Sequence, residues 1–240
     1  MAQTLSILIP VFNEARTVRK LLDRVSSVPF INGVKTQLVV VNDCSTDTTD
    51  PEVRGFIADH PKLDVVYRQH SKNQGKGAAL HTALEAFTGD FAVVQDADLE
   101  YDPHEINVLL KPVLDGHADV VYGSRFMGAH PHRVLYFWHT VGNRVLTTLS
   151  NAFTNLNLTD METCYKLWTR DVIKQVAPHL KEKRFGFEPE VTARVAKLPG
   201  VRIYEVGISY FGRSYEEGKK INWKDGVSAV RCIVKYGLAK

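Results

Sequence analysis

Short apolar runs alternate with segments of helical periodicity through the first half of the chain. The apolar runs at residues 5–10, 37–41, 63–67, 91–95 and 120–122 predict strands, because each is brief and bounded by turn-forming residues. Apolar residues recur at helical spacing in residues 14–25, 48–59, 75–87 and 103–114, which predicts helices. Asn13 and Thr48 are expected N-caps, and Gly89 is an expected helix stop. This order predicts an α/β fold in which helices flank both faces of a mostly parallel central sheet.

The second half of the chain is less regular. It contains a long amphipathic segment at residues 134–156, helical patterns at 170–180, 188–196 and 223–238, and an expected strand at 202–209. No repeat or low-complexity linker interrupts the 240 residues, of which 44% are apolar, so we expect a single domain over residues 1–240. The change of pattern near residue 125 marks a functional division within that domain.

The charge and cysteine content indicate which kinds of binding partner and which cellular location to expect. The net charge of +3, from 30 basic and 27 acidic residues, is too small to indicate a nucleic-acid partner. Residues 125–159 lack Asp and Glu but include Arg125, Arg133 and Arg144, which suits either an anionic ligand or membrane, or a merely solvated basic face. Three widely spaced cysteines favour a reducing, cytoplasmic location. The first apolar run is typical of a strand rather than a signal peptide, and no run is long enough to span a membrane.

Acidic residues follow the fourth expected strand. Asp96, Asp98 and Glu100 stand at alternate positions, which share one face in an extended chain. Three carboxylates at the carboxyl end of a strand repel one another unless a cation joins them, and open parallel sheets bind ligands at that edge. Mg²⁺ or Mn²⁺ suits such oxygen ligands and leaves room for a diphosphate. In the competing interpretation, Asp98 caps the next helix and Glu100 is solvated.

Polar turns also follow the first two expected strands. Residues 10–14 read Pro-Val-Phe-Asn-Glu and residues 42–47 read Asn-Asp-Cys-Ser-Thr-Asp, so short polar side chains lie at the same edge as the carboxylates. A nucleoside fits across these strand ends, with Asp43 accepting from a base N–H. Residues 75–77 (Gly-Lys-Gly) add a turn at which backbone N–H groups and one ammonium approach a phosphate or a base. Each feature also occurs as an ordinary turn, cap or helix start.

Taken in order, these motifs resemble one family. The residues that carry the resemblance are Pro10-x-x-Asn13-Glu14, Asn42-Asp43-x-Ser45-x-Asp47, Gly75-Lys76-Gly77-Ala78-Ala79, Asp96-Ala97-Asp98-Leu99-Glu100 and Gly123-Ser124-Arg125. Residues 5–221 resemble the family 2 glycosyltransferases of GT-A fold, and within them the dolichol-phosphate mannosyltransferase and polyprenyl-phosphate glycosyltransferase branch. The resemblance implies a Rossmann-like nucleotide-binding half, residues 1–124, and an acceptor half, residues 125–240. In two departures, Asn42 replaces a frequent Asp, and residues 160–166 replace an Asp-x-x-Ser/Cys-Gly-Phe pattern.

The resemblance implies roles for residues on the donor side. A nucleotide sugar and a divalent cation, Mg²⁺ or Mn²⁺, are expected to bind at the edge of the sheet, with Lys76 near the base or ribose. The implied donor-binding residues are Pro10, Phe12, Asn13, Glu14, Asp43, Ser45, Lys76, Asp96, Ala97, Asp98, Arg213 and Lys219. The implied metal ligands are Asp96, Asp98 and Glu100.

On the acceptor side the resemblance implies a bound lipid phosphate. Arg125 and Arg144 match positions that hold this phosphate, and planar guanidinium groups suit the task. Arg213, Lys219 and Lys220 resemble a late basic loop that closes over the donor and acceptor phosphates, with Lys220 on the acceptor side. Asp160 is expected to orient Arg144 or this loop, and the competing interpretation of each cation is a solvated surface charge. The residues expected to act in catalysis are Asp98, Arg125, Arg144, Asp160 and Arg213.

The segment at residues 134–156 mixes aromatic and aliphatic residues with His139, Asn143 and Arg144. The mixture is too polar to span a bilayer but suits a helix in the headgroup region, with a covered core helix or a dimer interface as the alternative. The partners implied are a nucleotide-sugar donor and a polyprenyl phosphate acceptor. Either peripheral contact with the cytoplasmic face of a membrane or a membrane-anchoring partner protein would bring the lipid to the site.

The implied activity is an inverting transfer of a hexose from a nucleotide sugar, of the GDP-mannose or UDP-glucose type, to polyprenyl or dolichyl phosphate. An ionised phosphate needs no strong general base. A family 2 transferase that acts on a saccharide hydroxyl is the alternative, and it needs a base among Asp160, Glu162, Glu188 and Glu190. A non-catalytic nucleotide-sugar-binding protein is a further alternative. A nucleotidyltransferase is another, although the N-terminal glycine-rich signature of that class is absent.

Overall fold

Seven strands form one sheet in the residues that the computed structural model describes, which are 3–128, 133–134, 136–213 and 223–239. The strands are β1 (Thr4–Val11), β2 (Lys35–Asn42), β3 (Asp64–Gln69), β4 (Phe91–Val94), β5 (Val120–Ser124), β6 (Lys166–Thr169) and β7 (Ile203–Gly207). Their spatial order is β3-β2-β1-β4-β6-β5-β7, and within this described sheet only β6 runs antiparallel to its neighbours. The expected mostly parallel sheet is confirmed.

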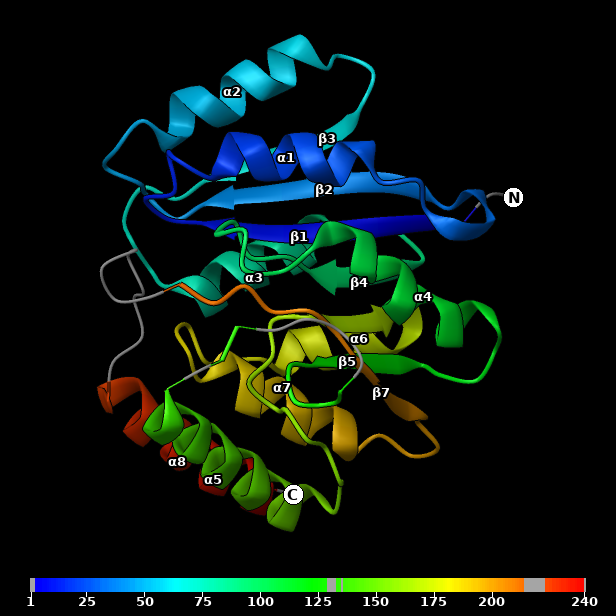
Figure 1. Ribbon diagram of the computed structural model, residues 1–240, viewed down its shortest axis with the longest axis vertical. Helices are drawn as coiled ribbons and strands as arrows, with labels where there is room; N and C mark the ends of the chain where they lie inside the picture. Colours follow the sequence, from blue (N-terminus) through cyan, green and yellow to red (C-terminus); the bar gives the residue numbers. More distant parts are fainter. Residues whose placement is uncertain (1–2, 129–132, 135, 214–222, 240) are drawn as a thin grey trace.

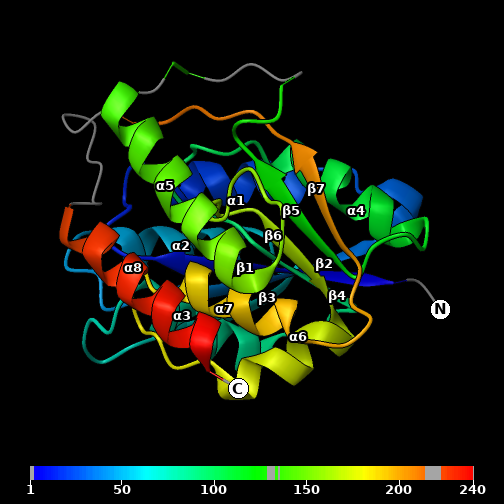
Figure 2. The same cartoon turned by 90° about the horizontal axis from the view of Figure 1, so that it is seen from below.

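Helices cover both faces of this sheet (Figure 1, Figure 2). One face carries α1 (Val18–Ser27) and α4 (Ile106–Leu114), with α2 (Thr49–Asp59) packed beside α1. The other face carries α3 (Lys76–Ala86), α6 (Arg170–Val176) and α7 (Phe187–Ala196). Short 3₁₀ turns are η1 (Ile31–Gly33), η2 (Pro103–Glu105) and η3 (Ala177–His179). Because both faces are covered, the central strands are largely apolar, and Ile7, Leu8 and Ile9 in β1 are fully buried.

Two further helices form an outer layer. α5 (Phe137–Thr154) and α8 (Trp223–Leu238) lie side by side, and both contact α7. The N-terminal ends of α5 and α8 lie on the side of the molecule where the parallel strands have their carboxyl ends (Figure 1). Within the described part of the chain, no helix is both long enough and apolar enough to cross a membrane.

Besides shifts of a few residues at the ends of other elements, one strand and the start of one helix differ from the sequence prediction. No strand was expected at β6, because its four residues begin with a lysine and follow polar residues, so no apolar run announces them. α1 begins at Val18 instead of residue 14, since Asn13 has a φ of 51° and residues 14–17 form a turn. Asn13 is therefore not an N-cap. Thr48 does precede α2, but its side chain makes no capping hydrogen bond.

Gly89 is required by close packing rather than by helix termination. α3 ends at Ala86, before this glycine, and the Gly89 N–H donates to the buried Ser6 hydroxyl at 2.9 Å. A Cβ at residue 89 would lie 2.7 Å from the Ser6 backbone nitrogen. Ser6 in turn donates to Gln37 at 2.7 Å, so this buried polar group links β1 and β2 to the start of β4.

Candidate functional site

The loops that follow β1 and β2 are joined at the carboxyl edge of the sheet. The Asn13 N–H donates to Ser45 Oγ at 2.9 Å, and the Asn13 side-chain oxygen accepts from the Thr46 N–H at 2.8 Å. The positive φ of Asn13 is a left-handed conformation that Asn adopts more readily than most residues. Pro10 and Phe12 lie beside them and are partly exposed. The two polar turns that the sequence placed at this edge therefore form one surface.

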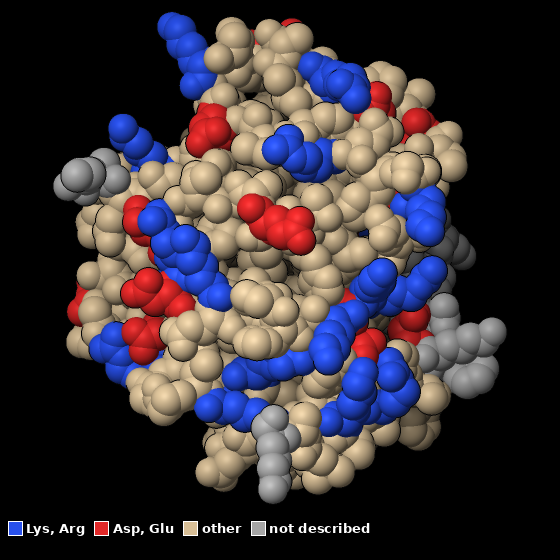
Figure 3. All heavy atoms as spheres, turned by 180° about the vertical axis from the view of Figure 1, so that it is seen from behind, with Lys and Arg blue, Asp and Glu red and all other residues tan. Residues whose placement is uncertain are grey.

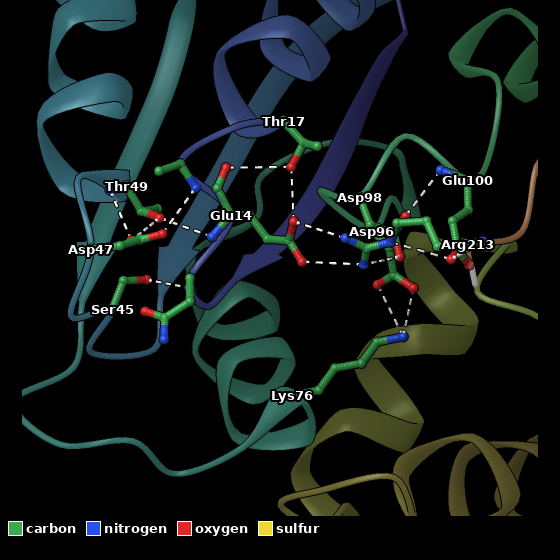
Figure 4. A network of polar contacts seen from close by, with 12 residues as sticks. Glu14, Thr17, Ser45, Asp47, Thr49, Lys76, Asp96, Asp98, Glu100 and Arg213 are labelled. Carbon is green, nitrogen blue, oxygen red and sulfur yellow. Dashed lines mark hydrogen bonds and ion pairs between the residues drawn. The ribbon is translucent and has the colours of Figure 1, made fainter. Parts of the chain in front are cut away.

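Glu14 connects this surface to the late part of the chain. Its N–H donates to Thr49 Oγ1 at 2.9 Å, and its carboxylate accepts from the Thr17 hydroxyl at 2.8 Å (Figure 4). The same carboxylate lies 3.3 Å from the guanidinium of Arg213. Asp47, at the end of the second loop, accepts from the Thr49 hydroxyl at 2.5 Å. Glu14 thus stands between the two loops and the segment after β7.

The Asp43 carboxylate binds the loop that precedes α3. Its side chain is only 3% exposed, and its Oδ1 lies 2.7 Å from the His70 ring nitrogen Nδ1. The backbone N–H groups of Gln74 and Gly75 donate to the two carboxylate oxygens at 2.9 Å and 2.7 Å. Both oxygens are therefore occupied in this structure. Contact between Asp43 and a nucleoside base stays a prediction, and it requires some of these bonds to exchange for bonds to the base.

The glycines at positions 75 and 77 are explained by a crossing segment of the protein itself. Gly75 has a φ of 99°, and a Cβ there would lie 2.5 Å from the carbonyl oxygen of Lys183. A Cβ at Gly77 would overlap the carbonyl oxygen of Glu182 and lie 2.8 Å from the carbonyl carbon of Lys183. The Ala78 N–H also donates to the Lys183 oxygen at 3.0 Å. The expectation that the N–H groups of this turn face a phosphate is therefore wrong for Gly75 and Ala78.

Replacement of Gly77 by alanine is expected to destabilise the protein by roughly 1–3 kcal/mol, because the added methyl group meets backbone atoms that cannot rotate away. Urea denaturation measures this change in the free energy of unfolding. Gly55→Ala in α2 is the matched control, since its Cβ would meet only the flexible Arg19 side chain at 3.7 Å. That variant should gain about 0.5–1 kcal/mol from helix propensity. An equal gain in Gly77→Ala would contradict the packing described here.

The acidic residues after β4 lie in a turn. β4 ends at Val94 and Leu99 has a φ of 64°, so the expectation that alternate residues share one strand face is wrong. Asp98 Oδ1 accepts from the Glu100 N–H at 3.1 Å, which closes the turn. Burial, together with the neighbouring charges of Asp96 and Glu100, raises the pKa of Asp98 to about 7. The carboxylates are therefore close together, although not for the reason that the sequence pattern suggested.

Two cations of the chain contact this acidic turn (Figure 4). Lys76 Nζ lies 3.0 Å from Asp96 and 3.2 Å from Glu188, and Arg213 Nη2 lies 3.2 Å from Asp98. Lys76 begins α3, whereas Arg213 follows β7, so the fold brings them to the acidic turn from distant parts of the sequence. Both residues were expected at the donor site, and both contact the acidic turn.

Asp96 and Asp98 are the carboxylates best placed for a divalent cation. They are partly exposed at the open edge of the sheet, and their oxygens are the ligands that Mg²⁺ and Mn²⁺ prefer. A cation there would also relieve the repulsion that contributes to the raised pKa of Asp98. Glu100 differs, because its two oxygens accept from the Tyr210 hydroxyl at 2.6 Å and the Arg213 N–H at 2.8 Å. Among the described residues, no three His, Cys, Asp or Glu side chains are grouped so as to hold a metal together.

Arg125 is buried against Asp160 in the second half of the chain. Their side chains are 10% and 0% exposed, and two guanidinium N–H groups of Arg125 donate to the two Asp160 oxygens at 2.6 Å and 2.8 Å. Burial alone would raise the pKa of Asp160, but the Arg125 charge outweighs burial and lowers it. Asn143 from α5 also donates to Asp160 at 3.2 Å. The expectation that Asp160 orients Arg144 or the late loop is corrected, because Asp160 holds Arg125.

Arg144 is in a different environment from Arg125. It lies on the exposed side of α5, and no hydrogen bond or ion pair joins it to any described residue. It borders an open groove of about 450 Å³. The other residues that line this groove are Val141, Val145, Thr148, Leu149 and Ala152. A guanidinium that has no partner among the described residues therefore stands beside an apolar surface. Lys219 and Lys220, the other expected phosphate-binding cations, lie outside the described residues.

A buried charged cluster lies beneath the acidic turn. Lys166 at the start of β6 is buried, with its ammonium 5.2 Å from the centre of the Tyr122 ring, and burial lowers the pKa of that ammonium. Burial, and next the charge of Glu188, raises the pKa of Glu162 to about 8. Glu162 and Glu188 each keep one buried carboxylate oxygen that finds no hydrogen-bond partner among the described residues.

These contacts narrow the choice of general base for a hydroxyl acceptor. Asp160 is bound to Arg125, and Glu190 is bound to Arg194 at 2.8 Å and to the backbone N–H groups at 181 and 182. Of the four carboxylates considered, only Glu162 and Glu188 retain an oxygen that is not bonded to any described residue.

Replacement of Glu162 by glutamine is expected to change how stability depends on pH. Between pH 4.5, the ordinary pKa of the group in the unfolded chain, and about pH 8, the folded protein keeps a proton on Glu162 that the unfolded chain has lost. The favourable contribution is complete below pH 4.5 and disappears as the pH rises toward about 8. Urea unfolding at about pH 5 and about pH 8.5 should therefore show Glu162→Gln gaining stability relative to the wild type at the higher pH. The exposed Glu85→Gln in α3 serves as the control, and identical pH profiles for Glu162→Gln and wild type would contradict the burial of a protonated Glu162.

Sequence reasoning missed two residues of this region. Tyr210 was not assigned any role, because a single aromatic residue after a strand carries no motif. Lys166 was not assigned any role either, because a lysine ahead of two apolar residues is ordinarily solvated, and its burial follows from the packing of β6.

An open, mostly parallel sheet with polar loops and an acidic turn at its carboxyl edge is the arrangement of a nucleotide-binding α/β protein. Residues 6–177 match the sequence profile described as Glycosyl transferase family 2. Since this match covers well over half of the chain, the protein belongs to glycosyltransferase family 2.

Curated relatives are consistent with this family. The dodecaprenyl-phosphate galacturonate synthase of Rhizobium johnstonii is 26% identical over 216 residues, which cover 90% of this chain and 61% of the relative. The low-salt glycan biosynthesis hexosyltransferase Agl6 of Haloferax volcanii is 29% identical over 238 residues, covering 98% of this chain and 54% of the relative. Glycosyltransferase AglD of the same organism is 28% identical over 212 residues, covering 85% of this chain and 32% of the relative. The chain thus spans between 32% and 61% of the length of these three relatives.

A solved structure shares the fold. Glucosyl-3-phosphoglycerate synthase from Mycobacterium tuberculosis, crystallised with Mn²⁺, uridine diphosphate and phosphoglyceric acid, superposes with a TM-score of 0.73 at 18% identity. The superposition covers 99% of this chain and 80% of that chain. The expected GT-A fold is confirmed.

Proposed function

We propose that the protein transfers a hexose from a nucleotide sugar to a polyprenyl phosphate, with inversion at the anomeric carbon. The observation that carries this proposal is the acidic turn containing Asp96 and Asp98, with Lys76 and Arg213 in contact with it at the carboxyl edge of the sheet. Negative charge accumulates on a nucleoside diphosphate leaving group during transfer, so the group needs cations beside it. Lys76 and Arg213 are two such cations, and the carboxylates of the turn are ligands for a divalent one. The name of the Rhizobium relative, a dodecaprenyl-phosphate galacturonate synthase, supports a lipid phosphate as the acceptor.

On the donor side, the nucleoside is proposed to lie across the two loops that Asn13 and Ser45 join. Lys76 and Arg213 then face the diphosphate and stabilise the negative charge that develops on it. The proposed donor-binding residues that the structure describes are Pro10, Phe12, Asn13, Glu14, Asp43, Ser45, Lys76, Asp96, Ala97, Asp98 and Arg213. Lys219 stays a prediction from the sequence.

Mg²⁺ or Mn²⁺ is proposed to bind at Asp96 and Asp98. When bound, the cation neutralises charge on the departing diphosphate. The presence of Mn²⁺ and uridine diphosphate in the structure of similar fold supports this proposal. Because both oxygens of Glu100 are bonded within the protein, we give Glu100 the role of anchoring the segment that ends in Arg213 instead of the role of a metal ligand.

On the acceptor side, the lipid phosphate is proposed to meet Arg125 and Arg144. Arg125 offers fixed N–H geometry but little net charge, because Asp160 neutralises it. Arg144 offers the charge, and the apolar groove beside it suits an isoprenoid chain. A phosphate is already ionised at neutral pH, so the acceptor attacks without a general base. The nucleophilic phosphate oxygen forms the new bond to the anomeric carbon as the bond to the diphosphate breaks on the opposite side.

Peripheral contact with a membrane is proposed to bring the lipid to this site. Tyr136, Phe137 and Trp138, at the N-terminal end of α5, are 68%, 69% and 78% exposed, and aromatic side chains of this kind enter the headgroup region. The lower half of the face opposite to that of Figure 1, where α7 and α8 lie, carries many Lys and Arg side chains (Figure 3). Such cations attract anionic lipids, although Glu182 neutralises part of the charge through Arg231 and Lys235.

The decisive experiment follows the release of nucleoside diphosphate from a set of nucleotide sugars, with Mg²⁺ or Mn²⁺, in the presence and absence of a short polyprenyl phosphate. Release that depends on the lipid supports the proposed acceptor, and the productive donor identifies the sugar and base. Release that depends instead on a saccharide acceptor would contradict it. In that case Glu162→Gln or Glu188→Gln should abolish transfer, since only these two of the four candidate bases have an unbonded oxygen.

A further inference from the structure

Tyr210 lies where the donor and acceptor halves of the site meet. It follows β7 and is buried. Its hydroxyl donates to Glu100 Oε2 at 2.6 Å, and the guanidinium carbon of Arg125 lies 5.1 Å from the centre of its ring. One side chain therefore contacts both the end of the acidic turn and the buried arginine of the acceptor half.

Through its hydroxyl, Tyr210 acts on the position of Arg213. The Glu100 backbone oxygen accepts from the Phe211 N–H at 2.9 Å, and its Oε1 accepts from the Arg213 N–H at 2.8 Å. The Tyr210 hydroxyl holds the remaining oxygen of the same carboxylate. The orientation of the Glu100 carboxylate, and with it the path of the chain up to Arg213, therefore depends on that hydroxyl. Arg213 is the residue that contacts Asp98 at 3.2 Å.

Through its ring, Tyr210 acts on Arg125. The ring packs against Tyr101 with centroids 5.3 Å apart, and Tyr101 packs against Tyr165 at 4.9 Å. The Tyr165 hydroxyl donates to Gln95 at 2.6 Å, which ties this aromatic stack to the residue after β4. Asp160 holds the edge of the Arg125 guanidinium, and the Tyr210 ring supports its face. The ring is thus a fixed platform for Arg125.

We propose that Tyr210 is a positioning residue that couples the two halves of the active site. Its hydroxyl fixes the position of Arg213 through Glu100, and its ring fixes the position of the Arg125 guanidinium. This inference rests on the proposed function for the identity of the two ligands. The hydroxyl and the ring make separate contacts, so two substitutions can test their roles separately.

Tyr210→Phe removes the hydroxyl and keeps the ring, whereas Tyr210→Leu removes both. Tyr210→Phe is expected to lower kcat roughly 10- to 100-fold, because a hydrogen bond to a charged group is lost, with no change in KM for the lipid phosphate. Tyr210→Leu is expected to lower kcat similarly and also to raise the lipid KM roughly 3- to 30-fold, because Arg125 loses the ring beneath it. Steady-state kinetics with the donor saturating measure both effects.

Tyr122→Phe is the matched control. This tyrosine, in β5, is also fully buried, and its hydroxyl lies 3.0 Å from Thr192 Oγ1 in α7 instead of contacting Glu100. It should have wild-type kcat and KM. If the two Tyr210 variants change kcat and KM no more than Tyr122→Phe does, the coupling role is overturned.

A binding measurement separates this inference from the proposed function. Calorimetric titration of nucleoside diphosphate with Mn²⁺, in the absence of any acceptor, should show roughly 10-fold weaker binding to Tyr210→Phe than to the wild type. A wild type that shows no lipid-dependent release would overturn the proposed acceptor but leave this comparison intact. Equal nucleotide affinity in wild type and Tyr210→Phe would overturn the role given to the hydroxyl.

Discussion

Replacement of Asp98 by asparagine is expected to lower kcat by roughly 100- to 1000-fold, the range found when a group that stabilises transition-state charge is removed. Asp98 lies in the acidic turn 3.2 Å from Arg213, and we propose that it shares a divalent cation with Asp96. Asparagine keeps the size of the side chain but removes its charge, so the cation is held less tightly at the moment when the diphosphate leaves. Nucleoside diphosphate release at saturating Mn²⁺ measures the effect.

Loss of activity in Asp98→Asn is distinguished from unfolding by thermal denaturation. Burial and the neighbouring carboxylates raise the pKa of Asp98, so the folded state disfavours its charge, and removing that charge should not lower the melting temperature at neutral pH. Asp102→Asn is the matched control, because Asp102 follows in the same region and, among the described residues, its side chain is bonded only to the nearby His104. Turnover close to that of the control would show that the acidic turn is not the donor site.

Replacement of Asp160 by asparagine is expected to destabilise the protein by roughly 3–5 kcal/mol, because it leaves the buried guanidinium of Arg125 without its counter-charge. Asp160 is fully buried and accepts two hydrogen bonds from the Arg125 guanidinium and one from the Arg125 backbone N–H, so water cannot replace the lost carboxylate. The free energy of unfolding in urea measures the loss. A cost of this size is a large fraction of the total stability of an ordinary domain.

A second Asp–Arg pair in the same protein supplies the comparison. Asp119 binds Arg202 with similar geometry, but their side chains are 25% and 51% exposed. Asp119→Asn should therefore cost only about 0–1 kcal/mol, since water solvates the arginine that is left. Equal losses in the two variants would show that burial does not control the energetics of the Arg125 pair.

Local pattern was sufficient for most of the secondary structure and for predicting which loops meet at the carboxyl edge of the sheet. Strands such as β1 and β2 are covered on both faces, so they appear in the sequence as mostly apolar runs that need no tertiary information. The polar loops after these strands had to meet at one edge, because parallel strands share the direction of their carboxyl ends. Local pattern did not predict β6, which is short and begins with a lysine. It also placed the start of α1 too early, because Asn13 has a left-handed backbone conformation and the helix begins only at Val18.

Only the tertiary structure decided which charged groups are partners. Asp160 binds Arg125 instead of Arg144, Asp43 holds the loop before Gly75, and Lys76 stands between Asp96 and Glu188. Such pairings depend on how distant segments pack, and no local periodicity encodes them. The clearest case is the contact of Arg213 with Glu14 at a separation of 199 residues. The residue types already indicated an anion-binding edge of the sheet. Which charged side chains pair there, and how deeply each pair is buried, follows from the packing of the second half of the chain against the first.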